Sequence, residues 1–499
     1  MTARLVTIGD SLTQGFQHGA IRRTEWSFPA ILARALSIQP FLRPDFSGGA
    51  PNGVGGPLLD LELLLRELSD ICKDQVDLLE IHRVGAAVLQ TMDKVEGYWE
   101  RGDGTHASAT GPLHHNLGCW GFDVLDAVTL SDAVCQKNIP TPHNHLVVQL
   151  PERAMYRSAR RALNPAQNAD QAELKQLELA ELHGKSQPIE NLLVWLGGNN
   201  ALRTCATLGI HLSEGADLKR LSHERRCTLW RPEDFDQSLG QLERALVNVT
   251  AERVFLGTVP HVTIPPVTRG VTPSFKQRGV PEREGKYYEY YTRFWTWDRH
   301  FSPLFSEKLT RKEAKQIDDT IDRYNDSIRK LATKRGYHVI DFCKLLDELA
   351  FRRNDGQPPY RLPPGLVAAL GQNPATRHRV RPDGVVLLDT RFMGIPAEPP
   401  SENASSEEWQ KQYRGGIFGL DGVHPTTIGY GIIAHEVLKV FADKGVPGAD
   451  PNTLDWKGIV AADTLVCNPP RLLVSLEGTL DRVFAPLQLL FRLFDKLAG

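Results

Sequence analysis

Two short segments at opposite ends of the chain carry side chains that could together perform acyl transfer. Residues 9–15 (GDSLTQG) contain Ser11, whose hydroxyl is a weak nucleophile unless a base lies next to it. Residues 421–425 (DGVHP) supply that base as His424. Asp421, three residues earlier, can fix the tautomer of the imidazole and stabilise its protonated form. The residue types predict a serine nucleophile with Ser11, His424 and Asp421 as its catalytic group.

A third segment, residues 197–200 (GGNN), offers a donor for the negative charge of a tetrahedral intermediate. The amide of Asn199 can direct an N–H at the developing oxyanion, and the glycines before it permit a tight turn. The backbone N–H of Ser11 is a second candidate donor. These two groups form the predicted oxyanion hole, together with a glycine.

That glycine is expected to follow a strand. Gly85 is favoured because the apolar run 76–81 precedes it. Gly53 and Gly55, in residues 50–56 (APNGVGG), are alternatives for the same role. A backbone N–H from any of them would complete the donor set.

The elements that must position these groups are short apolar runs rich in Val, Ile and Leu. Such runs, far apart in sequence and separated by helical patterns, are typical of a parallel sheet covered on both faces. They predict a flavodoxin-like three-layer α/β/α sandwich with a central parallel sheet of about five strands and large loop insertions. In this architecture, the loops at the carboxyl ends of the strands carry the site. The expected strands are 4–8, 76–81, 191–196, 253–257 and 337–342.

Helical periodicity occupies the stretches between some of these runs. Apolar residues repeat at 4-3-4-3 spacing from Ile317 to Leu331, and Gly336 is placed as a C-terminal cap. Further helices are expected over 170–183 and 429–444.

Long stretches do not fit the alternation of strands and helices. We expect residues 1–445 to form one hydrolase domain and 446–499 a helical C-terminal extension. The aromatic residues at 287–297 suggest that about 280–300 caps the Ser11 site and binds an apolar acyl chain. The expected insertions cover about 97–145, 262–310 and 351–415.

Composition and charge narrow the class of protein. Hydrophobic residues make up 41% and charged residues 24% of the 499 positions, an ordinary globular balance. A formal net charge of -2 argues against a nucleic-acid partner. The seven Cys are scattered and include no CxxC pair, which is typical of free thiols in a reducing compartment. The sequence shows no signal peptide and no apolar run long enough to cross a bilayer. We therefore expect a cytoplasmic protein without a transmembrane segment. The oligomeric state is left open.

The order of these segments resembles that of the GDSL esterases and lipases, which belong to the SGNH hydrolase superfamily. The matching blocks are GDSL at 9–12, a glycine after the second strand, GxN at 197–199 and DxxHP at 421–425. The resemblance implies a nucleophile at Ser11, an acid–base pair at Asp421 and His424, and oxyanion donors at Ser11, Gly85 and Asn199. The sequence departs from the family at Asn200, where an Asp is usual.

The resemblance implies no metal and no organic cofactor. His114, His115, His143 and His145 lack accompanying carboxylates or cysteines at ligand spacing, and we interpret them as solvated loop residues rather than a metal site.

The expected activity is hydrolysis of a carboxylic ester through an acyl-enzyme, with a small-molecule or lipid ester as substrate. The aromatic insertion favours a lipid or long-chain acyl ester. A carbohydrate O-acetylesterase and an acyltransferase stay open as alternatives, as does a catalytically silent binding module.

Overall fold

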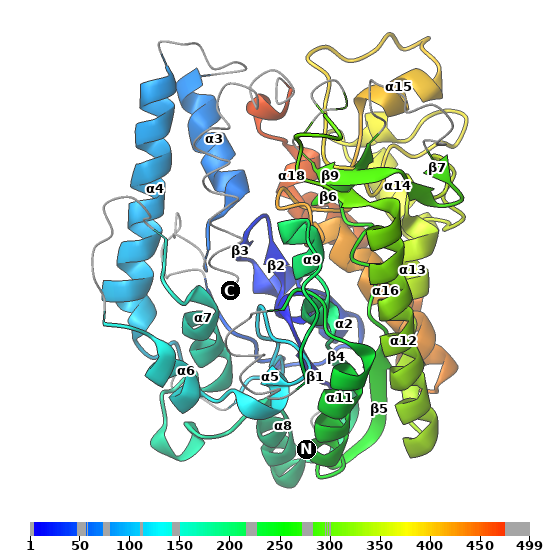
Figure 1. Cartoon of the computed structure of the whole chain (residues 1–499). Coiled ribbons are helices and arrows are strands. Elements are labelled where there is room, and N and C mark those ends of the chain that lie inside the picture. The colour runs from blue at the N-terminus through cyan, green and yellow to red at the C-terminus, as the bar shows by residue number, and fades with distance from the viewer. Residues whose placement is uncertain are drawn as a thin grey trace.

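A computed structural model describes residues 4–46, 56, 58–72, 80–109, 113–141, 150–215, 227–271, 283–294, 296, 298 and 301–474. Its centre is a parallel sheet of four strands in the order β1-β4-β5-β11 (Figure 1). The strands are β1 (Val6–Gly9), β4 (Ile189–Trp195), β5 (Ala251–Gly257) and β11 (His338–Ile340).

The two faces of the sheet bury alternate residues of each strand, as the pleat of a β-strand requires. In β4, Leu192 and Val194 enter one hydrophobic core, whereas Leu193 and Trp195 enter the other. In β5, Phe255 belongs to the second core, whereas its neighbours in sequence, Val254 and Leu256, belong to the first. Burial on both faces explains why these strands appear in the sequence as continuous apolar runs.

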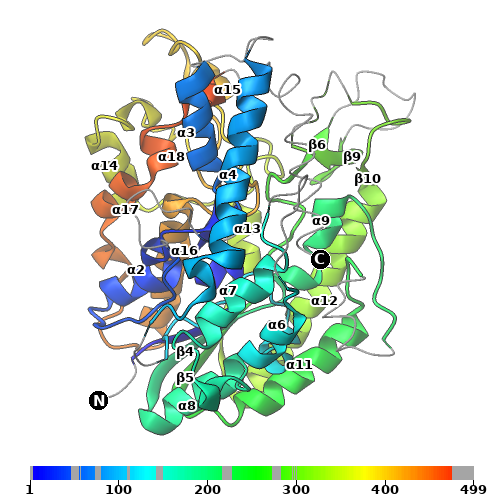
Figure 2. The ribbon, with the colours of Figure 1, turned by 90° about the vertical axis from the view of Figure 1, so that its left-hand side faces the viewer.

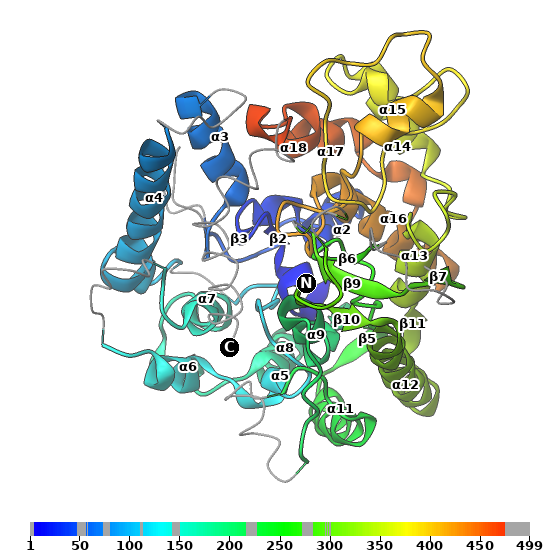
Figure 3. The same cartoon turned by 45° about the horizontal axis from the view of Figure 1, so that its top comes forward.

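Helices cover both faces and complete the three-layer α/β/α sandwich that the sequence predicts. One core contains apolar side chains of α8 (Gln176–Ser186), α11 (Pro232–Leu246) and α12 (Arg311–Arg335). The other contains those of α2 (Phe28–Ala35), α13 (Phe342–Leu349) and α16 (Thr427–Asp443). Figure 3 shows α11 and α12 on one side of the strands and α2 and α16 on the other.

Four of the five expected strands are confirmed, and one is not. Residues 73–79 lie outside the described part of the chain, and α4 (Ile81–Arg101) begins where the expected strand at 76–81 would end. A different segment runs beside β1. Asn116 forms a parallel bridge with Thr7, and the N–H of Leu117 donates to the carbonyl oxygen of Thr7 at 2.9 Å.

The helix expected from the 4-3-4-3 spacing is confirmed as α12. Its N-terminus is a capping box of Thr310 and Glu313, and Gly336 ends it with a left-handed φ of 69°. The helix expected over 429–444 is α16. The helix expected over 170–183 begins only at Gln176.

Helices α3 (Leu61–Cys72) and α4 precede most of the first expected insertion and lie side by side along one flank (Figure 2). The expected insertions themselves contain ordered elements. A separate antiparallel sheet has the order β10-β9-β6. Further elements outside the central sheet, some of them within these insertions, are β2 (Phe16–Gln17), β3 (Ala20–Ile21), β6 (Thr268–Val271), β7 (Arg283–Glu284), β8 (Tyr287–Tyr288), β9 (Tyr290–Arg293), β10 (Leu309–Thr310), α1 (Ser11–Gln14), α5 (Asp126–Thr129), α6 (Asp132–Asn138), α7 (Ala154–Leu163), α9 (Arg203–Thr207), α14 (Pro364–Gln372) and α15 (Ser406–Gln412).

The chain after residue 445 packs on the same core as α16. Helix α17 (Trp456–Ala462) contributes Trp456, Ile459 and Val460 to it, and α18 (Thr464–Cys467) follows. The rest of the expected C-terminal extension, 475–499, lies outside the described residues. Among the described helices, none combines the length and apolar character needed to span a membrane.

Candidate active site

Ser11 occupies the junction between the first strand and a short helix. Strand β1 ends at Gly9 and α1 begins at Ser11, so the side chain lies at the carboxyl end of the parallel sheet. The Asp10 carboxylate caps α1 by accepting the N–H of Leu12 at 3.0 Å. A Cβ at Gly9 would lie 2.7 Å from the carbonyl oxygen of Trp195, so the tight turn requires glycine.

His424 reaches Ser11 from the loop that precedes α16. Its Nε2 atom lies 2.9 Å from the Ser11 Oγ, and both side chains are buried. The Phe16 ring packs on the imidazole with 4.3 Å between ring centroids. The carbonyl oxygen of His424 accepts the N–H of Gly419 at 2.7 Å, which holds the loop in place.

Asp421 completes the arrangement on the other side of the imidazole. Its Oδ2 lies 3.1 Å from His424 Nδ1 and accepts the N–H of Gly19 at 2.7 Å. Its Oδ1 accepts the backbone N–H groups of Val423 and His424. Burial raises the pKa of Asp421, but the His424 charge and these hydrogen bonds outweigh burial and lower the pKa to about 2. The carboxylate is therefore ionised and oriented toward the ring.

A second carboxyl group near Ser11 behaves in the opposite way. Burial raises the pKa of Asp10 to about 6, and this effect exceeds the opposing contributions of the Leu12 N–H and the His424 charge. Two carboxyl groups near one histidine thus have pKa values on opposite sides of the ordinary aspartate value.

The GGNN segment follows β4 and brings both asparagines close to the loop after residue 119. The Asn199 Nδ2 donates to the carbonyl oxygen of Phe122 at 2.8 Å, and Asn199 lines the same cavity as Ser11. The Asn200 side chain, where the GDSL pattern usually has Asp, is buried and accepts the N–H of Val124 at 3.3 Å. Both amides therefore position this loop, and Asn199 retains a second N–H for a ligand.

The structure does not bring Gly85 to this site. Gly85 lies within the helix α4, and a Cβ there would meet nothing within 4 Å. Within a helix, its N–H is committed to the carbonyl oxygen four residues earlier. The expectation that Gly85 lies in a loop and donates its N–H to the oxyanion was therefore wrong, whereas residues 76–79 of the strand expected before it lie outside the described residues. The alternatives, Gly53 and Gly55, lie outside the described residues.

Residues 115–122 form the segment that follows β1 toward the Ser11 end of the strand. The N–H of Cys119 donates to the carbonyl oxygen of Gly9 at 3.0 Å, so the segment follows β1 to its carboxyl end. Gly121 then adopts a φ of 78°. Among the described residues, its N–H has no hydrogen-bond acceptor. The two glycines in residues 116–121 (NLGCWG) are the sequence signal that could have identified this segment.

A small apolar cavity of about 110 Å³ adjoins Ser11 and His424. It extends between α13 and α16, and it includes the loop after β5. Its apolar walls can hold a hydrocarbon group next to Ser11. The side chains that form these walls include Leu345, Leu346, Leu349, Ile432 and Ile433.

The aromatic segment does not line this cavity. Its described members Tyr288, Tyr291 and Phe294 line a different and larger cavity, of about 410 Å³. The Tyr287 hydroxyl donates to Asp318 at 2.9 Å. Trp295 and Trp297 lie outside the described residues. The expectation that this segment caps Ser11 is thus not met by the described residues.

His261 lies at the edge of the Ser11 cavity and has Cys343 and Asp347 as neighbours, with donor atoms within 4.8 Å of one another. Burial lowers the pKa of His261, but Asp322 and Asp347 outweigh it and raise the pKa to about 12. Arg353 also lies 3.1 Å from Asp347. His261 and Arg353 share the Asp347 carboxylate, so these side chains form an ion-pair network.

Two of the histidines interpreted as solvated are in fact packed. His114 is buried and His115 half-buried, and burial is the main cause that lowers the pKa of each to about 4. The Nδ1 of His115 accepts the N–H of Leu42 at 2.9 Å. His143 and His145 lie outside the described residues.

The sequence matches no protein-family model, and a search of curated proteins gives no match. The evidence for the candidate site is therefore the local geometry around Ser11.

Proposed function

We propose that this protein is a serine hydrolase of the GDSL type that cleaves carboxylic esters. One observation carries the proposal. His424 lies between Ser11 and Asp421, with Nε2 2.9 Å from the hydroxyl and Nδ1 3.1 Å from the carboxylate. This is the geometry of a nucleophile, a general base and a group that orients the base.

In the first half of the proposed reaction, the Ser11 Oγ attacks the ester carbonyl carbon. His424 Nε2 accepts the hydroxyl proton, and the Asp421 carboxylate stabilises the imidazolium that forms. The tetrahedral intermediate collapses as His424 returns the proton to the leaving alcohol. The acyl group is then esterified to Ser11.

Backbone and side-chain donors stabilise the oxyanion in this proposal. The Ser11 N–H belongs to the first turn of α1, where N–H groups have no acceptor within the helix. The Asn199 amide is the second donor. We assign the third to the N–H of Gly121 in place of Gly85, because Gly121 follows the segment beside β1 and its N–H has no acceptor among the described residues.

In the second half, water replaces the alcohol. His424 removes a proton from the water that attacks the acyl carbonyl carbon, and the same donors hold the second oxyanion. Collapse returns the proton to the Ser11 Oγ and releases a carboxylic acid. The chain's own residues perform every one of these proton transfers.

The apolar walls of the cavity beside Ser11 favour an apolar acyl group. Leu345, Leu349 and Ile433 would contact it. This lining is suited to a lipid-like or simple aliphatic ester rather than to an acetylated sugar with its hydroxyl groups.

The test is labelling with a fluorophosphonate probe, followed by mass spectrometry of the labelled peptide. We expect one adduct, on Ser11, and none in Ser11→Ala. Ser186→Ala, at an exposed serine at the end of α8, is the matched control and should label like the wild type. Absence of labelling in folded wild-type protein would instead favour a silent binding module.

A further inference from the structure

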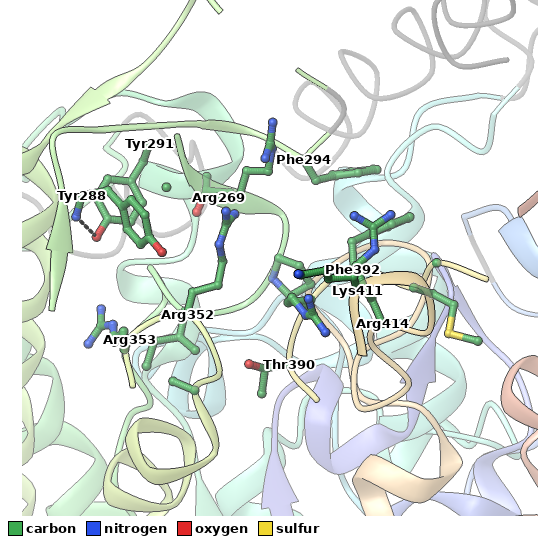
Figure 4. A pocket seen from close by; sticks show the side chains of 18 of the residues that line it. Arg269, Tyr288, Tyr291, Phe294, Arg352, Arg353, Thr390, Phe392, Lys411 and Arg414 are labelled. Atoms are coloured by element: carbon green, nitrogen blue, oxygen red, sulfur yellow. Dashed lines mark hydrogen bonds between the residues drawn. The ribbon is translucent and has the colours of Figure 1, made fainter. Parts of the chain in front are cut away.

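The cavity of about 410 Å³ has a wall that is unusually rich in positive charge. It lies between β6, β8 and β9, the chain after α13, and residues 390–396 and 411–414. In Figure 4, Tyr288 and Tyr291 lie at one end, and Phe392, Lys411 and Arg414 at the other. No described Asp or Glu lines it. The cationic lining residues are Arg269, Lys286, Arg352, Arg353, Arg391, Lys411 and Arg414.

Carboxylates behind the wall neutralise several of these cations. Arg269 pairs with Asp298 at 2.8 Å, and Arg391 pairs with Asp389 at 2.8 Å. Arg353 is held by Asp318 and Asp347, and exposed Lys411 by Glu407. These pairs hold the three guanidinium groups and the Lys411 ammonium in place at the wall of the cavity.

Two of these cations have no carboxylate within ion-pair distance among the described residues. Arg352 lies 5.3 Å above the Tyr288 ring. Lys286 is exposed and lies 5.6 Å above the Tyr287 ring, and its charge helps to lower the pKa values of Asp322 and Asp347 from a longer distance. The charge of Arg352 also acts on the cations around it. Burial is the main cause that lowers the pKa of Arg269 to about 10, and the positive charges of Arg352 and Arg414 lower it further against the opposing effect of Asp298.

We propose that this cavity is a binding site for a small organic phosphate monoester. The phosphate dianion would be a direct counter-ion for Arg352 and would also attract Lys286, since guanidinium and ammonium groups bind phosphate oxygens with charge-assisted hydrogen bonds. Its organic part would pack on the aromatic side chains. The cavity volume is suited to a molecule of that size.

The aromatic lining supports an organic group rather than a free ion. Phe294 and Phe392 stack with 4.4 Å between centroids, and Tyr288 contacts Tyr291 edge to face. These rings are held in place before a ligand arrives, which lowers the entropic cost of binding.

The site is separate from the proposed active site. The two cavities share no lining residue, and the chain from 262 to 266 contributes residues to both walls. Binding there does not require that Ser11 act as a nucleophile. The inference therefore goes beyond the proposed hydrolase and stands or fails independently of it.

The test is isothermal titration calorimetry of the full chain with three probes. Phenyl phosphate carries both the dianion and a ring, inorganic phosphate lacks the ring, and benzyl alcohol lacks the charge. We expect saturable binding of phenyl phosphate, weaker binding of inorganic phosphate and none of benzyl alcohol. Equal binding of phenyl phosphate and benzyl alcohol, or no binding of phenyl phosphate, would overturn the proposal.

Variants locate the site. Arg352→Gln removes a charge-assisted contact and should weaken phenyl phosphate binding about 10- to 100-fold. Lys286→Gln should weaken it in the same direction. Arg323→Gln, at an exposed arginine of α12 away from the cavity, is the matched control and should bind like the wild type.

A further variant separates this inference from the hydrolase proposal. Ser11→Ala should bind phenyl phosphate with the wild-type affinity, even if it proves to be catalytically inert. If Arg352→Gln and Lys286→Gln stay folded and bind as tightly as Arg323→Gln, the phosphate lies elsewhere and the assignment is wrong.

Discussion

The Nε2 atom of His424 lies 2.9 Å from the Oγ of Ser11, although 413 positions separate them in the sequence. The contact arises because β1 ends at Gly9, two residues before Ser11, and the loop before α16 returns to the same edge of the sheet. Gly422, with a φ of 71°, lets that loop turn between Asp421 and His424.

His424→Ala should remove nearly all ester hydrolysis, because Ser11 then has no base. Asp421→Asn should lower kcat by about 10³–10⁴-fold, because the amide no longer favours the required tautomer and no longer stabilises the imidazolium. Hydrolysis of p-nitrophenyl esters measures both. If Asp421→Asn kept wild-type kcat in a folded protein, the proposed role of Asp421 would be lost.

Asn199→Ala should lower kcat by about 10²–10³-fold with little change in KM, the usual result of removing one oxyanion donor. The variant also loses the hydrogen bond to Phe122. Steady-state kinetics with one ester distinguish the two roles. A rise in KM alone would make Asn199 a substrate contact.

Two glycine substitutions distinguish Gly85, the oxyanion glycine expected from the sequence, from Gly121, the one proposed in its place. Gly85→Ala should leave hydrolysis unchanged and stabilise α4 by about 0.5–1 kcal/mol, because an alanine fits the helix without a clash. Gly121→Ala should impair hydrolysis, because φ is 78° and its Cβ would lie 2.9 Å from the Met155 sulfur. The opposite ranking would restore Gly85 as the donor.

Ile433→Phe should fill part of the cavity beside Ser11. We expect the kcat/KM ratio of butyrate over acetate p-nitrophenyl esters to fall, because the longer acyl chain needs that space. Leu182→Phe, at an exposed position of α8, is the control. An unchanged ratio in a folded Ile433→Phe protein would show that the acyl chain lies elsewhere.

The free energy of unfolding of Asp10→Asn, compared with that of the wild type, should increase as the pH rises. The pKa of Asp10 is about 6 in the folded protein against 3.8 ordinarily, so the folded state holds its proton more tightly. Wild-type stability therefore falls between about pH 4 and pH 6 on account of this group, by at most about 3 kcal/mol. Asn stays neutral and keeps the acceptor for Leu12.

Urea denaturation at pH 4.5 and pH 8 measures this effect as the difference between variant and wild type. That difference should grow with pH. Asp421 has the opposite sign: its pKa of about 2 contributes stability above about pH 4 that is lost as the pH falls toward 2. A difference between Asp10→Asn and wild type that is equal at both pH values would show that Asp10 is not the group responsible.

Local patterns in the sequence were sufficient to predict much of the fold and part of the candidate site. Strands β1, β4, β5 and β11 are continuous apolar runs because both faces of the sheet are covered. Helix α12 is recognisable from its 4-3-4-3 spacing and its glycine cap. Ser11 and Asn199 could be identified because each follows a predicted strand, and His424 because it precedes a predicted helix.

Only the tertiary structure decided which segment lies beside β1. Residues 76–81 and 115–119 both contain apolar side chains, and their composition favours the first. The choice depends on hydrogen bonds from Thr7 to His115 and from Leu117 to Thr7, between residues more than 100 positions apart. A long-range pairing of this kind leaves no periodic signal, so the sequence pattern favoured Gly85 over Gly53 and Gly55 and did not indicate Gly121.

The positive cavity was likewise invisible in the sequence. Arg269, Lys286, Arg352 and Arg414 belong to separate segments whose local composition is unremarkable, and the chain as a whole has a net charge of -2. Their charges act together only because the chain packs these segments around one space, where partial burial strengthens the interaction between like charges.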